Sequence, residues 1–585
     1  MQPTSTAGAL GRGLARRALL GAAISIAAAC APASRPVSRE RADYPTDFGE
    51  LAAFIAGHLQ RIDPAGAVAL GVHKYDGELP DLTPAGLADA SALLRRDREA
   101  LAAVVRDELT PTQAFEREVL LIEIGQALFR IVELDSYRSN PMSYSGAINL
   151  DAYMIRDYTP ADQRAAAVIQ LCTRLPAHLA QARFNLKLPM PRPWLDTAIL
   201  QTHGMLEFAD RDVRAAFGPE LARRTELDAA LDTCKAALAE HESWLTAQHK
   251  LATADGFALG AELFLRMLSE TQGITTDLAT LDRLAEADLE RNLAAIEQAA
   301  RAIDPARPVA DVVRAAADDR PLPAEVLTVA TDQATAMRRF VIEHRIATIP
   351  SDDRAVVRES PPFRRWNSAF LDTPGPFETT PFASYYYITP PDPSWPEDEQ
   401  RAYVPPRNDL LFTTIHEVYP GHFLQHLHIR NHPSRIVQSM CTSSTTEGWA
   451  HYTEEMMYDE GAGGRTPQVR IGMLKKALLR NVRFVVTLGL HTRGLTVDQA
   501  TELFRTKAFL DPRNSKQQAT RGTFDPMYLA YTIGKLMIIK LRNDWMAAHP
   551  GKPIGEFHDA FLGHGCAPIP VIRRAMLGAE AGPAL

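Results

Sequence analysis

The stretch that decides the fold is "TPTQAFEREVLLIEIGQALFRIVEL", residues 110–134. It opens with Thr110 before Pro111, a typical helix start, because threonine caps free backbone N–H groups and proline is tolerated at the first helical position. Apolar side chains then recur at the spacing of one helical face: Phe115, Val119, Ile122, Ala127 and Ile131. The pattern predicts a long amphipathic helix.

The same helix-start signal recurs at Thr83-Pro84 and Thr159-Pro160, each followed by another amphipathic run. We therefore expect residues 45–345 to form a helical domain that makes one wall of a deep cleft.

Beyond residue 345 the composition changes, because residues 346–408 are rich in proline, aromatic and turn residues. The best strand candidate there is Ala383–Thr389, which we expect at the edge of a small sheet, free to pair with an extended substrate. After residue 409 the pattern is helical again. We predict a catalytic region over 346–585 and a mainly α fold, with a small β-sheet near the active site.

Composition excludes some functions for this 585-residue chain. It is 46% hydrophobic and 23% charged, which is typical of a folded globular protein. Its net charge of -8 does not suit a nucleic-acid binder, which usually carries a basic face. The sequence does not indicate the oligomeric state.

The N-terminus indicates export. Arg16 and Arg17 precede a short apolar run that ends in small residues before Cys30, and a Pro/Ser/Arg linker follows. We predict an export signal over 1–30, a linker over 31–44, and lipidation of Cys30 as the only membrane attachment. The protein would then be periplasmic or membrane-anchored. The alternative is an ordinary cleaved signal with an incidental cysteine.

The other four cysteines are scattered and form no C-x-x-C pair: Cys172, Cys234, Cys441 and Cys566. In an exported protein they could form one or two disulfides, whose pairing the sequence does not reveal. Buried free thiols are the alternative.

The stretch "HEVYPGHFLQ", residues 416–425, carries the chemistry. His416 and His422 are six positions apart, which on a straight helix turns them about 120° away from a common face. Pro420 and Gly421 lie between them and favour a break or bulge that would reunite the two imidazoles. A rival pair, His422 and His426, has the regular spacing of four but lacks a glutamate beside it.

A hydrolytic zinc site needs three protein ligands and one open position. Within "TTEGWAHYTEEMMYDEG", residues 445–461, we expect Glu447 to be the third ligand on a helix capped by Thr445 or Thr446. Glu454 lies two turns further on the same face and could orient a ligand histidine, as could Gln425 after His422. The metal predicted is one Zn²⁺ ion per chain.

Glu417 is the natural general base, because it directly follows a predicted ligand. Candidate donors to a developing oxyanion are Tyr531 and His491, although a tyrosine on an apolar helix is more often a packed core residue. Arg521 or Arg407 could hold a substrate carboxylate. We expect Tyr528 and Tyr386 to contact substrate as well. His428 is expected at the surface or behind the ligands.

These residues form four motifs: H-E-x-x-P-G-H-x-x-Q from His416 to Gln425; E-G-W-A-x-Y-x-E from Glu447 to Glu454; G-L-H at Gly489, Leu490 and His491; and R-x-x-x-x-P-x-x-x-x-Y-x-x-G at Arg521, Pro526, Tyr531 and Gly534. Together they resemble the bacterial family called domain of unknown function 885. The likeness covers roughly residues 45 to 575 and includes "HRIATIPSDDRAVVRESPPFRR" before the catalytic segment.

The resemblance implies a mostly helical, zinc-metallopeptidase-like protein with a deep central channel, often an exported lipoprotein. By position, it implies His416, His422 and Glu447 as metal ligands, Glu417 as base and Tyr531 as donor. One departure is Thr487, where an aspartate is expected four residues before His491, which weakens the role of His491.

We therefore hypothesise a zinc-dependent peptidase, carboxypeptidase-like or oligopeptidase-like, acting on short peptides outside the cytoplasm. One alternative is a zinc hydrolase of a non-peptide amide or ester. The other is a non-catalytic surface lipoprotein that binds metal or peptide, which the intact Glu417 disfavours.

Overall fold

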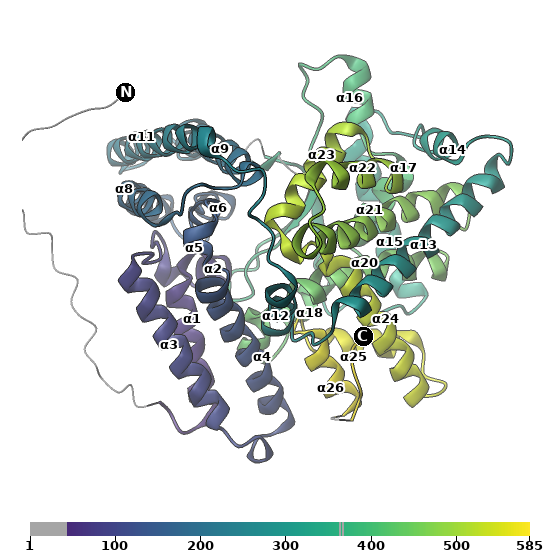
Figure 1. The fold of residues 1–585 in the computed structure, drawn as a ribbon, viewed down its shortest axis with the longest axis horizontal. Helices are drawn as coiled ribbons and strands as arrows, with labels where there is room; N and C mark the ends of the chain where they lie inside the picture. The colour runs from purple at the N-terminus through teal and green to yellow at the C-terminus, as the bar shows by residue number, and fades with distance from the viewer. Residues whose placement is uncertain (1–43, 362–363, 366–367, 579) are drawn as a thin grey trace, which may run out of the picture. The chain divides into compact units, whose positions relative to one another are not determined.

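The computed structural model describes residues 44–361, 364–365, 368–578 and 580–585. The predicted export signal with Arg16, Arg17 and Cys30, and the linker up to residue 43, lie outside the described residues. Within that part of the chain, the mainly α fold is confirmed (Figure 1). No described helix is both long and apolar enough to cross a membrane.

Helices fill the described chain up to residue 345. Their bounds are α1 (Phe48–Ile62), α2 (Pro64–Ala69), α3 (Pro84–Ala103), α4 (Pro111–Leu128), α5 (Ser136–Ser139), α6 (Met142–Ser145), α7 (Ala152–Ile155), α8 (Ala161–Asn185), α9 (Arg192–Glu207), α10 (Arg214–Ala216), α11 (Arg224–Gln248), α12 (Ala261–Gln272), α13 (Leu278–Ile303), α14 (Val309–Ala315) and α15 (Val326–Glu343).

The remaining chain contains a small sheet followed by further helices. Their bounds are β1 (Ala355–Glu359), β2 (Ala369–Asp372), β3 (Ser384–Ile388), α16 (Glu397–Tyr403), α17 (Arg407–Glu417), α18 (His422–Arg430), α19 (Arg435–Ser439), α20 (Ser443–Glu460), α21 (Pro467–Thr492), α22 (Val497–Lys507), α23 (Pro512–Phe524), α24 (Ala530–Ala548), α25 (Ile554–Leu562) and α26 (Ile569–Leu577).

The helix predicted from residue 111 is confirmed as α4. Thr110 Oγ1 accepts a hydrogen bond from the Gln113 backbone N–H at 3.3 Å, and the Gln113 side chain accepts from the Thr110 N–H at 3.0 Å, which forms a capping box. The last turn of the predicted stretch, Phe129–Glu133, is a π-helix. The start at Thr83 is also confirmed, whereas α8 begins one residue later than expected, with Pro160 at its N-cap.

The strand prediction is half right. Residues 384–388 do form β3, but the strand order is β1-β3-β2, so β3 is the central strand, parallel to β1 and antiparallel to β2. Both of its edges are occupied, and the expected pairing of this strand with a substrate is wrong. Residue alternation reports which faces are buried but not which neighbours pair with a strand.

Helices α20 and α24 cross closely because two glycines meet at the crossing. A side chain on Gly448 would lie 2.6 Å from the Gly534 Cα, and one on Gly534 would lie 1.9 Å from the Ser444 carbonyl oxygen. Since neither position has room for a Cβ, the glycines of two separate sequence motifs fix the distance between these helices.

A buried charge network holds the same helices in register. Lys535 is fully buried, and its Nζ contacts Asp288 Oδ2 at 2.8 Å and Glu455 Oε2 at 3.1 Å. Asn481 Nδ2 also donates to Asp288 Oδ2, at 2.7 Å. These contacts join α13, α20, α21 and α24.

Of the four described cysteines, Cys441 and Cys566 form a disulfide across a sequence separation of 125 residues. It ties the segment before α20 to the loop between α25 and α26. Cys172 and Cys234 are buried free thiols on α8 and α11, and a hydrogen bond to Cys234, with burial, raises the pKa of Cys172. The described cysteines therefore include one disulfide and two buried free thiols, the two outcomes that the sequence left open.

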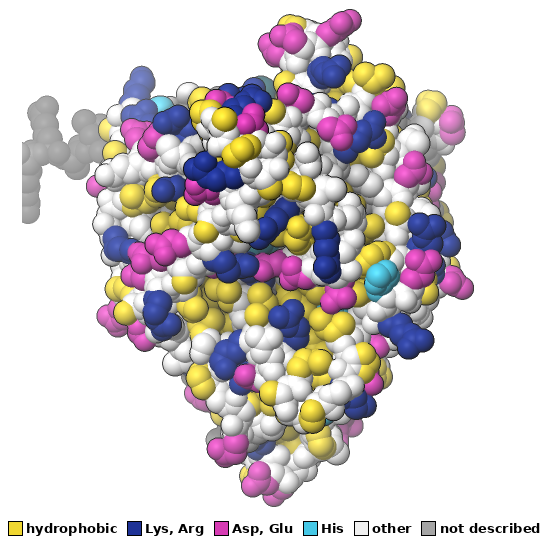
Figure 2. Space-filling model, turned by 90° about the vertical axis from the view of Figure 1, so that its right-hand side faces the viewer, with side chains coloured by type: hydrophobic (Ala, Val, Ile, Leu, Met, Phe, Trp, Pro, Cys, Tyr) yellow, Lys and Arg dark blue, Asp and Glu magenta, His cyan; other side chains and the backbone are white. Residues whose placement is uncertain are grey.

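Acidic and basic side chains alternate over the face shown in Figure 2, with hydrophobic side chains between them. This mixture gives that face no broad basic area. The expectation that the protein does not bind nucleic acid stays a prediction.

Candidate metal centre

The helix carrying the H-E motif ends at Glu417, and a second helix begins at His422, so the predicted break between these residues is confirmed. The Gly421 N–H donates to the Ile415 carbonyl oxygen at 3.0 Å. A Cβ at this position would lie 1.9 Å from the His416 carbonyl oxygen, so only glycine fits. The tight return of the backbone after Glu417 brings His422 back toward His416.

Helix α20 contacts the loop between α17 and α18. The Trp449 Nε1–H donates to the Pro420 carbonyl oxygen at 2.9 Å, and Trp449 is fully buried. Glu447 lies two residues before Trp449 on the same helix. The N-cap of α20 is Thr442, so the predicted caps Thr445 and Thr446 are wrong; Thr445 instead donates to the Ala567 carbonyl oxygen at 2.6 Å.

The structure brings His416, His422 and Glu447 together, with one potential ligand atom of each within 4.8 Å of the others. Glu447 Oε2 lies 3.5 Å from His416 Nε2 and 3.6 Å from His422 Nε2. This oxygen atom is buried and has no hydrogen-bond partner among the described residues. Bonds of about 2.0–2.2 Å to a tetrahedral zinc ion would space ligand atoms by about 3.3–3.6 Å, so this donor set fits zinc.

Glu454 and Arg480 lie behind His416. Glu454 Oε1 lies 2.7 Å from His416 Nδ1, and since a carboxylate only accepts, the proton is on Nδ1 and the lone pair of Nε2 is directed elsewhere. Arg480 on α21 holds the same carboxylate with two nitrogens, at 2.9 and 3.1 Å. The contacts from Arg480 to Glu454 and from Glu454 to His416 fix the tautomer and orientation that a histidine ligand needs.

Glu447 and Glu454 are both held ionised. Burial acts to raise the pKa of Glu454, but the Arg480 charge and the hydrogen bond to His416 outweigh burial and lower it. Burial likewise opposes ionisation of Glu447, but the adjacent imidazoles of His416 and His422 lower its pKa well below the ordinary value. Burial and Arg480 act to lower the pKa of His416, yet the nearby carboxylates of Glu447 and Glu454 raise it to about 9.

Glu417, the predicted base, is partly exposed at the end of α17. Its Oε2 accepts a hydrogen bond from the Leu371 backbone N–H at 3.0 Å. Leu371 belongs to β2, an edge strand, so the small sheet lies directly against the carboxylate that follows His416.

Tyr531, the predicted oxyanion donor, lies beside the ligands. Its ring is stacked near that of His416, with centroids 6.4 Å apart. Burial and the Glu447 charge raise the pKa of its hydroxyl, which keeps the hydroxyl protonated and able to donate.

His491 lies elsewhere. It is buried, and its Nε2–H donates to the Gly522 carbonyl oxygen at 2.8 Å. Since a helix rises about 1.5 Å per residue, His491 is roughly 16 Å along α21 from Arg480. It packs against Phe264, and Thr487 is buried one turn before it. The expectation that His491 donates to a substrate is corrected, because its position makes it a packing residue.

Tyr386 is also unavailable to a substrate. It is completely buried on the central strand, and its hydroxyl lies 3.3 Å from Thr414 Oγ1 of α17. Its expected contact with substrate is therefore corrected to a contact between the sheet and α17.

Tyr528 and Arg521 lie together near Tyr531. Tyr528 is buried and its hydroxyl donates to Gln518, while the Arg521 guanidinium carbon lies 4.7 Å from the centre of the Tyr528 ring. Arg521 also pairs with Asp525 at 3.0 Å, so it already has an acidic partner. Arg407 pairs with Asp319 and Glu325, at the opposite end of α17 from His416.

The remaining candidates lie on α18. Gln425 is buried, and neither its Nε2 nor the Nδ1 of His422 has a hydrogen-bond partner among the described residues. His426 is absent from the ligand group, and burial lowers its pKa to about 4. His428 is partly buried, and its Nε2–H donates to the Thr348 carbonyl oxygen at 2.9 Å.

Sequence reasoning missed Arg480 and Arg483, which are both buried on α21. The available signal was their spacing of three residues within the mostly apolar run "LLRNVRFVV", residues 478–486, because charged side chains on the buried face of a helix need a partner.

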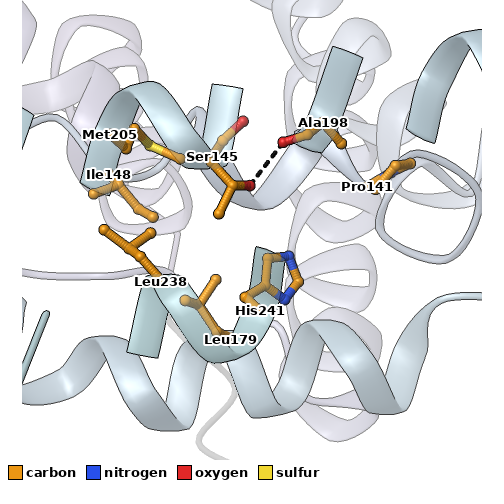
Figure 3. A pocket seen from close by; sticks show the side chains of 9 residues that line it. Pro141, Ser145, Ile148, Leu179, Ala198, Met205, Leu238 and His241 are labelled. Carbon is orange, nitrogen blue, oxygen red and sulfur yellow. Dashed lines mark hydrogen bonds between the residues drawn. The ribbon is translucent and has the colours of Figure 1, made fainter. Parts of the chain in front are cut away.

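A small cavity lies apart from this centre, among α6, α8, α9 and α11 (Figure 3). Its lining is mostly apolar, with Ile148, Leu179 and Leu238 facing His241. Burial lowers the pKa of His241 to about 4, so this histidine is neutral, and the cavity lining holds no carboxylate to act with it. The His416 centre is the better candidate.

A family model described as "Bacterial protein of unknown function (DUF885)" matches residues 64–576. Among solved structures, a "putative lipoprotein of unknown function from Shewanella oneidensis" is 24% identical, with a TM-score of 0.77 over 91% of this chain and 100% of that one. A "putative lipoprotein from Colwellia psychrerythraea" is 17% identical, with a TM-score of 0.76 over 90% and 98% of the two chains. No curated protein matches. These likenesses show the fold.

Proposed function

The chain belongs to the bacterial DUF885 family, whose function is unknown, and from its own geometry we propose that it is a zinc-dependent peptidase acting on short peptides outside the cytoplasm. The observation that carries the proposal is the convergence of His416 Nε2, His422 Nε2 and Glu447 Oε2 at the end of the helix that presents Glu417.

Three protein ligands would leave the fourth coordination position of a zinc ion open for water. Two imidazoles and one carboxylate are three protein ligands, which is the number used by catalytic rather than structural zinc sites. Bound zinc would activate a water molecule and polarise the carbonyl group that it attacks. Glu454 and Arg480 support the proposal because they fix His416 in the tautomer that a metal requires.

Glu417 would transfer protons, and Tyr531 would stabilise the charge that develops on the substrate oxygen. Glu417 would take a proton from the attacking water and pass it to the leaving amine. The Tyr531 hydroxyl would donate to the oxygen of the carbonyl under attack as that oxygen gains charge. The Leu371 N–H already fixes one oxygen of Glu417, so its carboxylate is oriented before a substrate arrives.

The test is peptide turnover by the purified chain, with zinc content measured on the same sample. We expect one zinc ion per chain, loss of turnover with a chelator, restoration by zinc, and loss of at least about 100-fold in Glu417→Gln with zinc content unchanged. Turnover that survives both the chelator and Glu417→Gln would refute the proposal. Turnover of amides or esters but not peptides would favour the non-peptide hydrolase. Tight zinc binding without turnover of any of these would favour the binding protein.

We propose further that the chain is exported and anchored through a lipid on Cys30, since the fold is shared with bacterial proteins described as lipoproteins. Labelling with a radioactive fatty acid tests this proposal. Label should enter the wild-type chain and be absent from Cys30→Ser, whereas equal labelling of both, or of neither, would refute the lipid anchor.

A further inference from the structure

Arg483 is a buried cation beside the candidate centre that has no acidic partner among the described residues. Only 8% of its surface is exposed, and it forms no ion pair with a described Asp or Glu side chain. The two other arginines near Tyr531 are paired, Arg480 with Glu454 and Arg521 with Asp525. Because arginine stays protonated and burying an unpaired charge is costly, Arg483 calls for an anion that the chain itself does not supply.

The guanidinium group is held rigidly. Its Nε donates to Gln518 Oε1 at 3.0 Å, and its central carbon lies 4.6 Å from the Tyr528 ring centre and 4.9 Å from the Tyr531 ring centre. Gln518 is itself fixed, because it also accepts from the Tyr528 hydroxyl. A guanidinium oriented in this way suits a carboxylate, which it can bind through two nitrogens.

Tyr531 lies close to both Arg483 and the metal ligand His416. Its ring centre lies 4.9 Å from the Arg483 guanidinium carbon and 6.4 Å from the His416 ring centre, so those two outer points are at most about 11 Å apart. Since an extended residue spans about 3.5 Å, one to three residues of a peptide would bridge this distance. A peptide bond at the centre would then place a chain end near Arg483.

We propose that Arg483 binds the free C-terminal carboxylate of the peptide substrate, so that the protein releases short fragments from C-terminal ends. The inference rests on the peptidase proposal. In the reaction, the oxygen of one water bonds to the carbonyl carbon and the C–N bond breaks. A proton of that water goes to the departing amine, which leaves with its carboxylate still on Arg483.

The test is calorimetric binding of two peptides to the Glu417→Gln chain, with zinc and after chelation. The probes are N-acetyl-tetraalanine with a free C-terminus and the same peptide as its C-terminal amide. We expect the acid to bind about 10-fold to 100-fold more tightly than the amide, as for a charged hydrogen bond. Adding Arg483→Gln should bring the ratio near one. Arg470→Gln is the matched control on the same helix, because Arg470 contacts Gln298 away from the ligands, and it should leave the ratio unchanged.

Arg483→Lys serves as a second variant if Arg483→Gln does not fold, which circular dichroism would reveal. Lysine keeps the charge but loses the forked donors, so the acid-to-amide ratio should fall several-fold. Equal binding of acid and amide to the parent chain, a ratio unaffected by Arg483 substitutions, or no binding of either peptide would overturn the inference.

The outcomes also separate this inference from the proposed function. Wild-type turnover of acid and amide peptides at equal efficiency would leave the peptidase standing and overturn the role of Arg483. The opposite result is also distinguishable. If the acid peptide binds more tightly than the amide in a way that depends on Arg483, but the wild-type chain turns over no peptide, the carboxylate site would be supported and the peptidase proposal refuted.

Discussion

Trp449 and Pro420 are joined by a hydrogen bond of 2.9 Å from the indole Nε1–H to the backbone carbonyl oxygen, across 29 residues of sequence. The bond connects the break between α17 and α18 to the helix that carries Glu447. It explains why the E-G-W-A and H-E-x-x-P-G-H motifs belong to one site. The fully buried tryptophan thereby positions the loop between the two histidines.

Trp449→Phe should therefore weaken zinc binding as well as stability. The buried Pro420 carbonyl would lose its donor, which should lower the free energy of unfolding by about 1–3 kcal/mol. His422 follows this loop and should lose its fixed position, so the Kd for zinc should rise. Denaturant unfolding and zinc titration measure the two effects. Trp194→Phe is the matched control, because Trp194 Nε1 donates to the Thr523 carbonyl oxygen at 3.1 Å, away from the ligands. An unchanged zinc Kd in Trp449→Phe would contradict this account.

Gly421→Ala should abolish zinc binding, because its Cβ would lie 1.9 Å from the His416 carbonyl oxygen. The contact is with backbone, so it can be relieved only by moving α17 or α18. Zinc content after purification is the measurement. The control is Gly57→Ala in α1, where nothing lies within 4 Å of the new Cβ. That change should leave zinc binding intact and stabilise the chain by about 0.5–1 kcal/mol. Full zinc occupancy in Gly421→Ala would contradict the tight return of the backbone between Glu417 and His422.

Glu454→Gln tests the carboxylate behind His416. It removes the charge that holds the His416 Nδ1–H and leaves Arg480 without its acidic partner, so the Kd for zinc should rise about 10-fold to 100-fold. Competition with a chromophoric chelator measures the Kd. The control is Glu460→Gln at the exposed end of the same helix, which should leave the Kd unchanged. Equal zinc affinity in both variants would remove Glu454 from the centre.

His558 should make the protein less stable in mild acid. It is buried and neutral, because its Nδ1–H donates to the Ile346 carbonyl oxygen at 2.6 Å and its Nε2 accepts from the Tyr452 hydroxyl at 2.8 Å. Burial lowers its pKa from 6.5 to about 4. The unfolded chain therefore binds a proton first as the pH falls. This contribution to stability is complete above pH 6.5 and is lost toward pH 4, by about 3 kcal/mol.

Denaturant unfolding between pH 7.5 and 4 measures that loss. In His558→Gln the slope of unfolding free energy against pH should decrease, although the variant is less stable throughout. His203→Gln, an exposed histidine on α9, should keep the wild-type slope. A His558→Gln slope equal to that of the wild type would show that His558 titrates alike in both states.

Local signals predicted much of the fold. The capping box at Thr110, the proline helix starts and the 3.6-residue periodicity all act within a few residues, so they can be recognised without tertiary contacts. The break at Pro420 and Gly421 belongs to the same class, because the steric limits of proline and glycine are intrinsic to those residues. Burial beyond the local pattern was not predictable, and Tyr386 and His491 were misassigned for that reason.

By itself, the sequence determined that the chain is mainly helical, that the helix must break between Glu417 and His422, and which side chains can ligate a metal, because these properties depend on residue chemistry and short-range sterics. Only the tertiary structure decided that β3 is a central strand, that Cys441 pairs with Cys566, and that Arg480 is neutralised while Arg483 is not. Those outcomes depend on which helices and strands lie next to each other, and packing sets that over separations of tens to hundreds of residues.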